Sequence, residues 1–178
     1  MKLLIIITAL MCTPMHLLAA SNNLSNTANS SLRSQLIGAW KLVSYVETPV
    51  DGSAPIHIFG KNPKGIIMYT PDGYMSAQLM SETRKPFASG DWFNGTPEEY
   101  IDEASTYIAY SGRFMVDEKQ RSLKHEMQVS LFPNWIGNLQ PRAVSINGNQ
   151  LTLGTVTPIM SKGKKVMSKL IWERVEKN

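Results

Sequence analysis

Residues 65–80 read GIIMYTPDGYMSAQLM, which is the plainest β-hairpin pattern in the chain. Two runs of apolar, aromatic and β-branched residues flank Pro71-Asp72-Gly73. Proline fixes its own φ near the value that a tight turn needs, and glycine accepts the positive φ that closes the turn. The pattern predicts an antiparallel β-hairpin whose turn lies at these three residues.

The rest of the chain repeats this arrangement of short strands and tight turns. Two further hairpins are predicted, one around residues 117–120 and one around Asn147-Gly148-Asn149. A strand at 38–46 precedes the hairpins, and a strand at 165–174 ends the series. Strands and long helices do not alternate, so the pattern indicates an all-β protein. A long meander removes its exposed edges by closing, so we expect an antiparallel up-and-down β-barrel.

One helix is predicted between the strands, at about residues 97–110. Thr96 is a typical N-cap, a proline follows it, and Glu99 stands at the capping-box position. Tyr107 and Tyr110 would lie in the last turn of this helix. From there the helix would lie over the mouth of the barrel as a lid, or simply pack against it.

Residues 1–20 have the layout of a secretory signal peptide. Lys2 precedes an apolar run at 3–10, and Ala19-Ala20 offers a cleavage point. The apolar run is shorter than the ~20 residues of a membrane-spanning helix. A buried N-terminal helix and a lipid anchor on Cys12 are the alternatives. We therefore expect a periplasmic or secreted protein.

The segment at 21–34 is polar and nearly uncharged, which predicts a disordered leader before the barrel domain at 35–176. Cys12 is the one cysteine of the 178 residues, so removal of the signal peptide would leave none. The mature chain would then contain neither a disulfide nor a cysteine nucleophile.

Composition excludes several classes of function. The formal net charge is +4, and no basic stripe with interleaved aromatic residues points to nucleic-acid binding. A mean hydropathy of −0.16 argues against a polytopic membrane protein, and we expect no membrane insertion after signal removal. His57 and His125 stand far apart in the chain, and no metal, phosphate or dinucleotide motif is present. We therefore expect neither a metal nor a cofactor.

Motifs at the two ends of the predicted barrel resemble those of the lipocalin superfamily. Gly38-x-Trp40 opens the first strand, and Trp172-Glu173-Arg174 closes the last one. The chain is most similar to the lipocalin-like domain proteins of bacteria and fungi, through LIGAWKLVSY, GIIMYTPDGYMSAQLM, FASGD, TPEEY and SLFPNWIG. The resemblance implies a barrel in which Trp40 packs beneath Arg174 at the closed end. It implies no shared reaction.

Strand alternation places His125 and Arg142 inside the barrel. His125 shares a face with Leu123, Met127, Val129 and Leu131, and Arg142 shares one with Val144 and Ile146. Their strands follow one another, so the two side chains are expected on neighbouring strands. Together they would receive a carboxylate or enolate oxygen, because arginine offers a charged fork and a buried charge needs a partner. A purely structural role for both residues is the alternative.

Further residues are candidates for lining a pocket. The first strand places Ser44 on the inward face with Trp40, whereas Glu47, like Glu126 and Glu173, is predicted to face outward. The remaining candidates are aromatic side chains, four of them with hydroxyl groups: Tyr69, Tyr74, Tyr107, Tyr110 and Trp135.

An apolar barrel interior with few inward polar residues, together with the absence of known catalytic motifs, favours a binding protein over an enzyme. We expect an exported lipocalin-like barrel that binds a small apolar or amphipathic molecule carrying a carboxylate or carbonyl oxygen. A cofactor-free cyclase or isomerase using His125 and Arg142 is the first alternative. The second alternative is a barrel filled by its own side chains, which would serve a structural or protein-binding role. The sequence does not indicate an oligomeric state.

Overall fold

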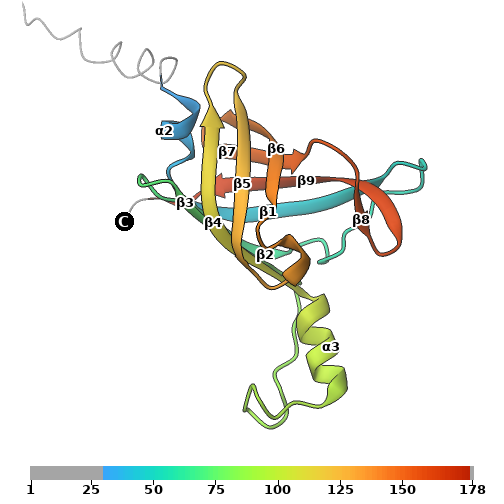
Figure 1. Cartoon of the computed structure of the whole chain (residues 1–178). Coiled ribbons are helices and arrows are strands. Elements are labelled where there is room, and N and C mark those ends of the chain that lie inside the picture. The colour runs from blue at the N-terminus through green and yellow to red at the C-terminus, as the bar shows by residue number, and fades with distance from the viewer. Residues whose placement is uncertain (1–29, 177–178) are drawn as a thin grey trace, which may run out of the picture. The chain divides into compact units, whose positions relative to one another are not determined.

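The computed structural model describes residues 30–176, which form an antiparallel β-barrel (Figure 1). The predicted signal peptide and most of the predicted leader lie outside these residues. Within them, eight strands pair in the order in which they close the barrel: β1 (Gly38–Pro49), β2 (Lys64–Tyr69), β3 (Tyr74–Met80), β4 (Tyr107–Asp117), β5 (Ser122–Ser130), β6 (Leu139–Asn147), β7 (Gln150–Thr155) and β9 (Lys164–Arg174). Because β1 pairs with both β2 and β9, the sheet closes, which confirms the predicted fold class.

The hairpin of β2 and β3 forms at the predicted turn. The pairing runs from Lys64↔Met80 to Tyr69↔Met75, and Gly73 adopts a φ of 98°. The short strand β8 (Ile159–Ser161) pairs only with β9 and extends beyond the barrel. A short 3₁₀ helix, η1 (Pro133–Trp135), lies in the loop between β5 and β6.

The predicted helix is present but shorter than expected. Helix α3 (Pro97–Ser105) begins with the expected capping box between Thr96 and Glu99. It ends at Ser105, so the prediction of a helix reaching residue 110 was wrong. Residues 107–110 instead pair with β3 as the start of β4, because tyrosine and isoleucine favour a half-buried strand with a paired neighbour.

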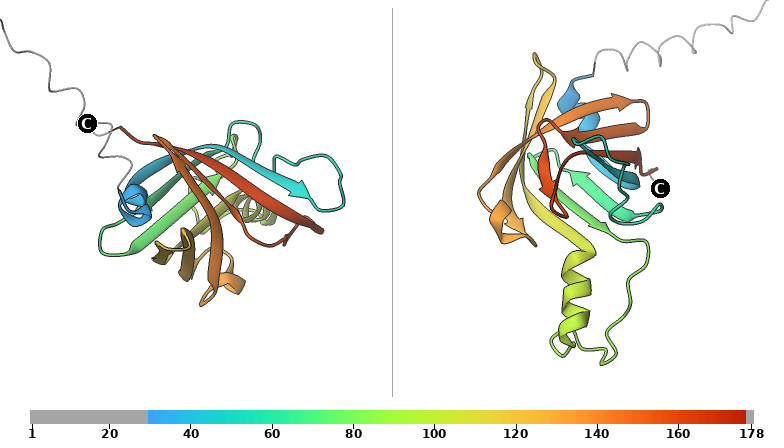
Figure 2. Two further views of the ribbon diagram at one scale, coloured as in Figure 1. Left: turned by 90° about the horizontal axis from the view of Figure 1, so that it is seen from above. Right: turned by 90° about the vertical axis from the view of Figure 1, so that its right-hand side faces the viewer.

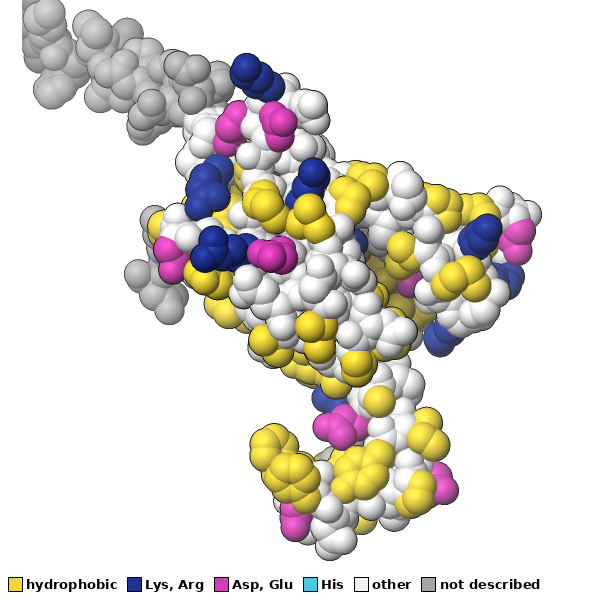
Figure 3. Space-filling view, in the orientation of Figure 1, with side chains coloured by type: hydrophobic (Ala, Val, Ile, Leu, Met, Phe, Trp, Pro, Cys, Tyr) yellow, Lys and Arg dark blue, Asp and Glu magenta, His cyan; other side chains and the backbone are white. Residues whose placement is uncertain are grey.

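Helix α3 and the loop before it form an arm, residues 81–105, that projects away from the barrel (Figure 2). No residue of α3 is buried, so this helix does not cover the mouth of the barrel as a lid. Hydrophobic side chains gather on the arm (Figure 3), among them Trp92 and Phe93, whose ring centroids lie 5.0 Å apart. Within the described residues, no helix has the length and apolar character needed to span a membrane.

Helix α2 (Leu32–Leu36) corrects the predicted extent of the disordered leader. Its first three residues lie in the segment predicted to be disordered, yet Leu32 and Leu36 are fully buried in the core. The Glu118 carboxylate accepts hydrogen bonds from the backbone N–H groups of Leu32 and Arg33 at the helix N-terminus. The segment is ordered because its leucines are buried and because the Glu118 carboxylate accepts hydrogen bonds from its backbone, although its composition alone suggests disorder.

Beside helix α2, the barrel is closed by Trp40 and Arg174. The Arg174 guanidinium lies 3.9 Å from the centroid of the Trp40 ring and donates hydrogen bonds to the backbone carbonyls of Ile37 and Gln35. Trp40 Nε1 donates to the carbonyl of Leu36 at 2.9 Å. These contacts tie the first and last strands to helix α2.

Two β-bulges reverse the alternation that the sequence suggests. In β1 the register against β9 shifts between Leu42 and Ser44, which leaves Val43 49% exposed. Beyond this bulge Tyr45 and Glu47 are buried, whereas Ser44 is not among the buried residues. The predictions of an inward Ser44 and an outward Glu47 were therefore wrong, because one extra residue moves all later side chains to the opposite face.

The second bulge lies where β5 pairs with β4, between Ser111 and Gly112. A Cβ atom on Gly112 would lie 1.8 Å from the carbonyl oxygen of Glu126, so only glycine fits this close approach. Leu123 and Met127 are buried as predicted, but Val129 and Leu131, beyond the bulge, are exposed. Their predicted inward orientation was wrong for the same reason.

We expect the replacement Arg174→Met to destabilise the barrel by about 2 kcal/mol, because hydrogen bonds to a charged group and the contact with Trp40 are lost. The exposed Lys169 lies on the same strand, and Lys169→Met serves as the matched control with little expected effect. Urea unfolding of both variants measures the difference. Equal stability of the two variants would contradict this role for Arg174.

Candidate functional site

The barrel contains a cavity of about 570 Å³. It lies toward the ends of the strands away from the Trp40–Arg174 contact, and the segments following β5 and β7 contribute to its walls. Most of the lining is apolar, with Phe132, Trp135 and Leu170 among the larger groups. Nine residues with polar groups complete the lining: Tyr45, Tyr110, Asn134, Asn138, Gln140, Arg142, Thr155, Thr157 and Ser168.

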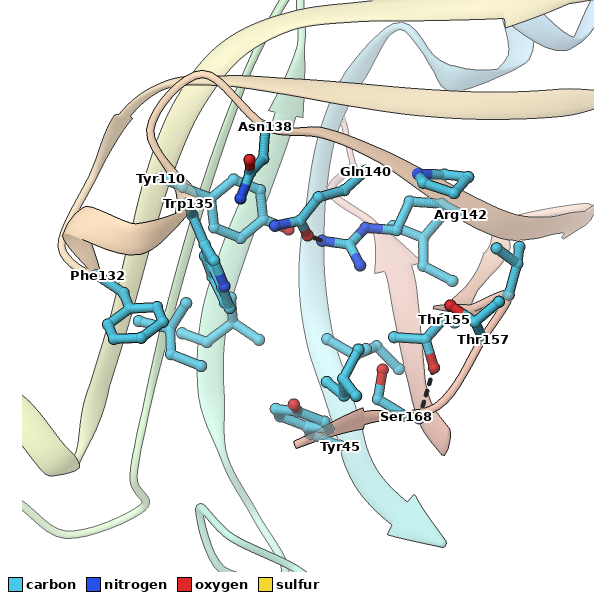
Figure 4. Close-up of a pocket in the computed structure, with 18 of the residues that line it drawn as sticks. Tyr45, Tyr110, Phe132, Trp135, Asn138, Gln140, Arg142, Thr155, Thr157 and Ser168 are labelled. Atoms are coloured by element: carbon cyan, nitrogen blue, oxygen red, sulfur yellow. Dashed lines mark hydrogen bonds between the residues drawn. The ribbon is translucent and has the colours of Figure 1, made fainter. Parts of the chain in front are cut away.

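Arg142 brings a positive charge into this cavity from β6 (Figure 4). Its Nη2 atom donates a hydrogen bond to Gln140 Oε1 at 2.6 Å. Among the described residues, no carboxylate lies within 4 Å of the guanidinium, since the one ion pair there joins Lys164 and Asp51. The arginine is thus half-buried and held by a neutral partner, which leaves its charge without a counterion.

The charge of Arg142 acts on three buried groups around it. Burial raises the pKa values of Tyr45 and Tyr69 and lowers that of His125. As a smaller effect, the Arg142 guanidinium lowers the pKa of all three groups. The tyrosines therefore stay protonated and His125 stays neutral near pH 7.

His125 points inward from β5 as predicted, but it does not line the cavity. Its Nε2 atom lies 2.9 Å from the Tyr69 hydroxyl oxygen, and its Nδ1 atom is buried without a hydrogen-bond partner. The ring of Tyr110 packs against the imidazole at a centroid distance of 6.1 Å and itself lines the cavity. Tyr110, rather than His125, therefore forms this part of the cavity wall.

The other candidates divide between the cavity wall and the outer surface. Trp135 lines the cavity from η1, and its ring meets those of Tyr110 and Phe132 edge-on, with centroids 5.8 and 5.7 Å apart. Tyr74 is exposed beneath the guanidinium of Arg113.

Tyr107 lies on the outer face of β4 and donates to Gln78 Oε1 at 2.7 Å. Ser44 lies beyond the first bulge and does not line the cavity. The structure therefore brings Arg142, Tyr110 and Trp135 to the cavity, and leaves Tyr74, Tyr107 and Ser44 away from it.

Three further residues in or beside the site were not predicted from the sequence: Tyr45, Glu47 and Gln140. Gln140 has the same parity as Arg142 along β6, and this signal was available in the sequence. Tyr45 and Glu47 face inward only because of the bulge at Val43. The Tyr45 hydroxyl donates to Glu47 Oε1 at 2.9 Å, and Glu47 Oε2 is buried without a hydrogen-bond partner.

The arrangement suits the binding of one compact amphipathic molecule. Aromatic and aliphatic walls bury an apolar body, and Arg142 offers charged N–H donors to an oxygen atom. Within residues 30–176, no group of three or more His, Cys, Asp and Glu side chains is placed to hold a metal ion.

The buried, neutral His125 predicts a pH-dependent stability. Its folded-state pKa lies well below its usual value, chiefly through burial, whereas the unfolded chain takes up the proton near pH 6.5. The free energy of unfolding should therefore fall by about 1 kcal/mol between pH 7 and pH 5.5. Urea titrations at both pH values measure the decline. The variant His125→Gln should lose it, whereas the control His57→Gln, at an exposed loop residue, should keep it.

Two comparisons with known proteins agree with this geometry. A family described as "Lipocalin-like domain" matches residues 37–175. A protein of Aspergillus oryzae, named a 4'-hydroxy-3'-methoxypropiophenone carrier protein, is 37% identical over 107 residues, which cover 57% of this chain and 96% of that protein. The barrel and a relative named as a carrier support the binding of a small molecule. The match over residues 37–175 shows that the chain belongs to the lipocalin-like domain family.

Proposed function

We propose that this chain binds a small amphipathic molecule in its barrel, with a carbonyl or acidic oxygen of the ligand directed at Arg142. The observation that carries the proposal is the half-buried guanidinium of Arg142, which lines the cavity and has no carboxylate within 4 Å among the described residues. A charge in an apolar barrel is costly without a counterion, and a ligand oxygen would supply the missing partner.

The dimensions of the cavity support a ligand of modest size. Its volume of about 570 Å³ lies within the ~300–1,000 Å³ that is common for small-molecule sites. The rings of Phe132, Trp135 and Tyr110, packed edge-on against one another, offer an apolar wall against which an aromatic ligand would pack. A barrel filled by its own side chains is disfavoured by this volume.

The Aspergillus oryzae relative suggests which probe to use first. The ligand in its name is an aromatic ketone with a hydroxyl and a methoxy group on the ring. This compound combines an apolar ring with a carbonyl oxygen, which is the chemistry proposed for the present cavity. We therefore take aryl ketones as the first probe class.

Catalysis by His125 and Arg142 is the less favoured alternative. A general base must reach the proton that it removes, but His125 is fully buried behind Tyr110 and lines no part of the cavity. Binding alone requires only the residues of the cavity wall. The geometry therefore favours a carrier or binding role.

The substitution Arg142→Met tests the proposed contact. We expect about tenfold or more weaker binding of 4-hydroxy-3-methoxybenzoate, and a smaller loss for the neutral 4'-hydroxy-3'-methoxypropiophenone, because the charge contributes most to binding an anion. The empty variant should also unfold at a higher urea concentration, because a buried charge without a counterion has been removed. Isothermal titration calorimetry measures both affinities.

Lys124→Met is the matched control, because Lys124 is exposed on the neighbouring strand β5. It should leave both affinities unchanged. Equal affinities of Arg142→Met and the wild-type protein for the benzoate would contradict the proposed site.

We also propose that the protein is exported and that the mature chain begins near Ser21, on the strength of the signal-like residues 1–20. Expression in a bacterial host followed by cell fractionation should place the protein in the periplasm or the medium. Its intact mass should match a chain that has lost Cys12 and contains no disulfide. A mass that includes Met1, or an acyl group on Cys12, would contradict this proposal.

A further inference from the structure

We infer that the cavity has a second polar anchor, formed by Tyr45 and Glu47, which accepts a hydrogen bond from a hydroxyl group of the ligand. The ligand class is then a hydroxy-carbonyl compound, with an acceptor oxygen at Arg142 and a donor hydroxyl at Tyr45. This inference rests on the proposed function, because it assumes that the ligand occupies the same cavity. We call Tyr45 and Glu47 the acceptor pair.

The direction of one hydrogen bond defines the acceptor pair. The Tyr45 hydroxyl has one proton and donates it to Glu47 Oε1 at 2.9 Å. Burial and the neighbouring Glu47 both raise the pKa of Tyr45, so the hydroxyl keeps this proton. With its proton engaged, the Tyr45 oxygen has only lone pairs left to offer. Toward the cavity that Tyr45 lines, it is therefore a hydrogen-bond acceptor.

Glu47 is unusual for a residue inside an apolar barrel. It is 1% exposed, its Oε2 atom has no hydrogen-bond partner, and no cationic side chain in the described part of the chain lies within 4 Å of its carboxylate. A buried group of this kind lowers stability, so its presence calls for an explanation. Hydrogen bonds in a chain polarise one another, so the bond to Glu47 makes the Tyr45 oxygen a stronger acceptor.

Tyr45, the member of the acceptor pair that lines the cavity, and Arg142 lie at different walls of it. Arg142 and Gln140 extend from β6, whereas Tyr45 lies on β1 beside Ser168 of β9, on the far side of the space drawn in Figure 4. Arg142 has donors and no acceptor, and Tyr45 offers an acceptor. A molecule between them is matched when it has an acceptor at one end and a donor at the other.

This polarity distinguishes a hydroxyl group from a methoxy group. A ligand hydroxyl donates a hydrogen bond to the Tyr45 oxygen. A methoxy oxygen has no proton to donate, so two acceptor oxygens would face each other and neither would be hydrogen-bonded. Sites built to hydrogen-bond a ligand hydroxyl discriminate strongly against analogues that lack it. The acceptor pair would therefore make the cavity selective for ligands that carry a hydroxyl group over their methoxy analogues.

Two neutral probes that differ only in this group test the inference: 4'-hydroxypropiophenone and 4'-methoxypropiophenone. Calorimetry on the wild-type protein should show at least about tenfold tighter binding of the hydroxy probe. In Tyr45→Phe the ratio of the two affinities should fall to about twofold or less. Tyr107→Phe is the matched control, because that hydroxyl lies on the outer face and bonds Gln78, and it should keep the wild-type ratio.

The double variant Tyr45→Phe/Glu47→Leu covers the case in which Tyr45→Phe fails to fold, because it removes the buried carboxylate together with its partner. It should bind both probes with similar affinity. Equal binding of the two probes by the wild-type protein, or an unchanged ratio in these variants, would overturn the acceptor pair. If Arg142→Met still weakens binding in that case, the proposed function stands. If neither probe binds the wild-type protein, the proposed function fails as well.

Discussion

The pairing of β1 with β9 gives the barrel its enclosed interior, and the other contacts follow from it. It joins the first and last strands from Trp40↔Arg174 to Pro49↔Val166 and so closes the sheet. A closed barrel has no free edge, and its inward side chains share one interior. Any polar group that enters this interior must find its partner there, either in another side chain or in a bound molecule. At the closed end, Trp40 and Arg174 meet this requirement through backbone carbonyls and a direct stack.

The inner polar groups meet the requirement to different degrees. His125 and the Tyr69 hydroxyl lie 2.9 Å apart and form a buried pair that stays away from the cavity. Arg142 has only a neutral amide as its partner, and Glu47 has one oxygen with none. His125 Nδ1 also has no hydrogen-bond partner. His125 lies behind the cavity wall, however, whereas Arg142 and Tyr45 line the cavity. We infer that the groups at the wall serve a ligand and that those behind it serve the fold.

The bulge at Val43 connects the backbone of the barrel to its binding chemistry. Without it, Ser44 would face the interior, and Tyr45 and Glu47 would face solvent. With it, Tyr45 lines the cavity on the side away from Arg142 (Figure 4), and Glu47 is buried beside Tyr45. The bulge opposite Gly112 has the contrary effect on β5, because it moves Val129 out of the interior. One inserted residue in each strand thus decides which side chains face the interior of the barrel.

Turns and helix caps could be predicted from the sequence, because residues close together in the chain determine them. The turn Pro71-Asp72-Gly73 and the capping box at Thr96 were predictable, because backbone φ preferences and hydrogen bonds within a few residues decide them. The inward side of Arg142 was also predictable, since β6 alternates without interruption.

Features that depend on pairing between distant strands could not be predicted from the sequence. A bulge arises from the register of two strands, so an alternation count within one strand assigned Ser44 and Glu47 to the wrong faces. The end of α3 and the orientation of Tyr107 depend on pairing with β3, and the order of α2 depends on burial in the closed end of the barrel. These contacts join residues far apart in the chain, and no local pattern of residues specifies them.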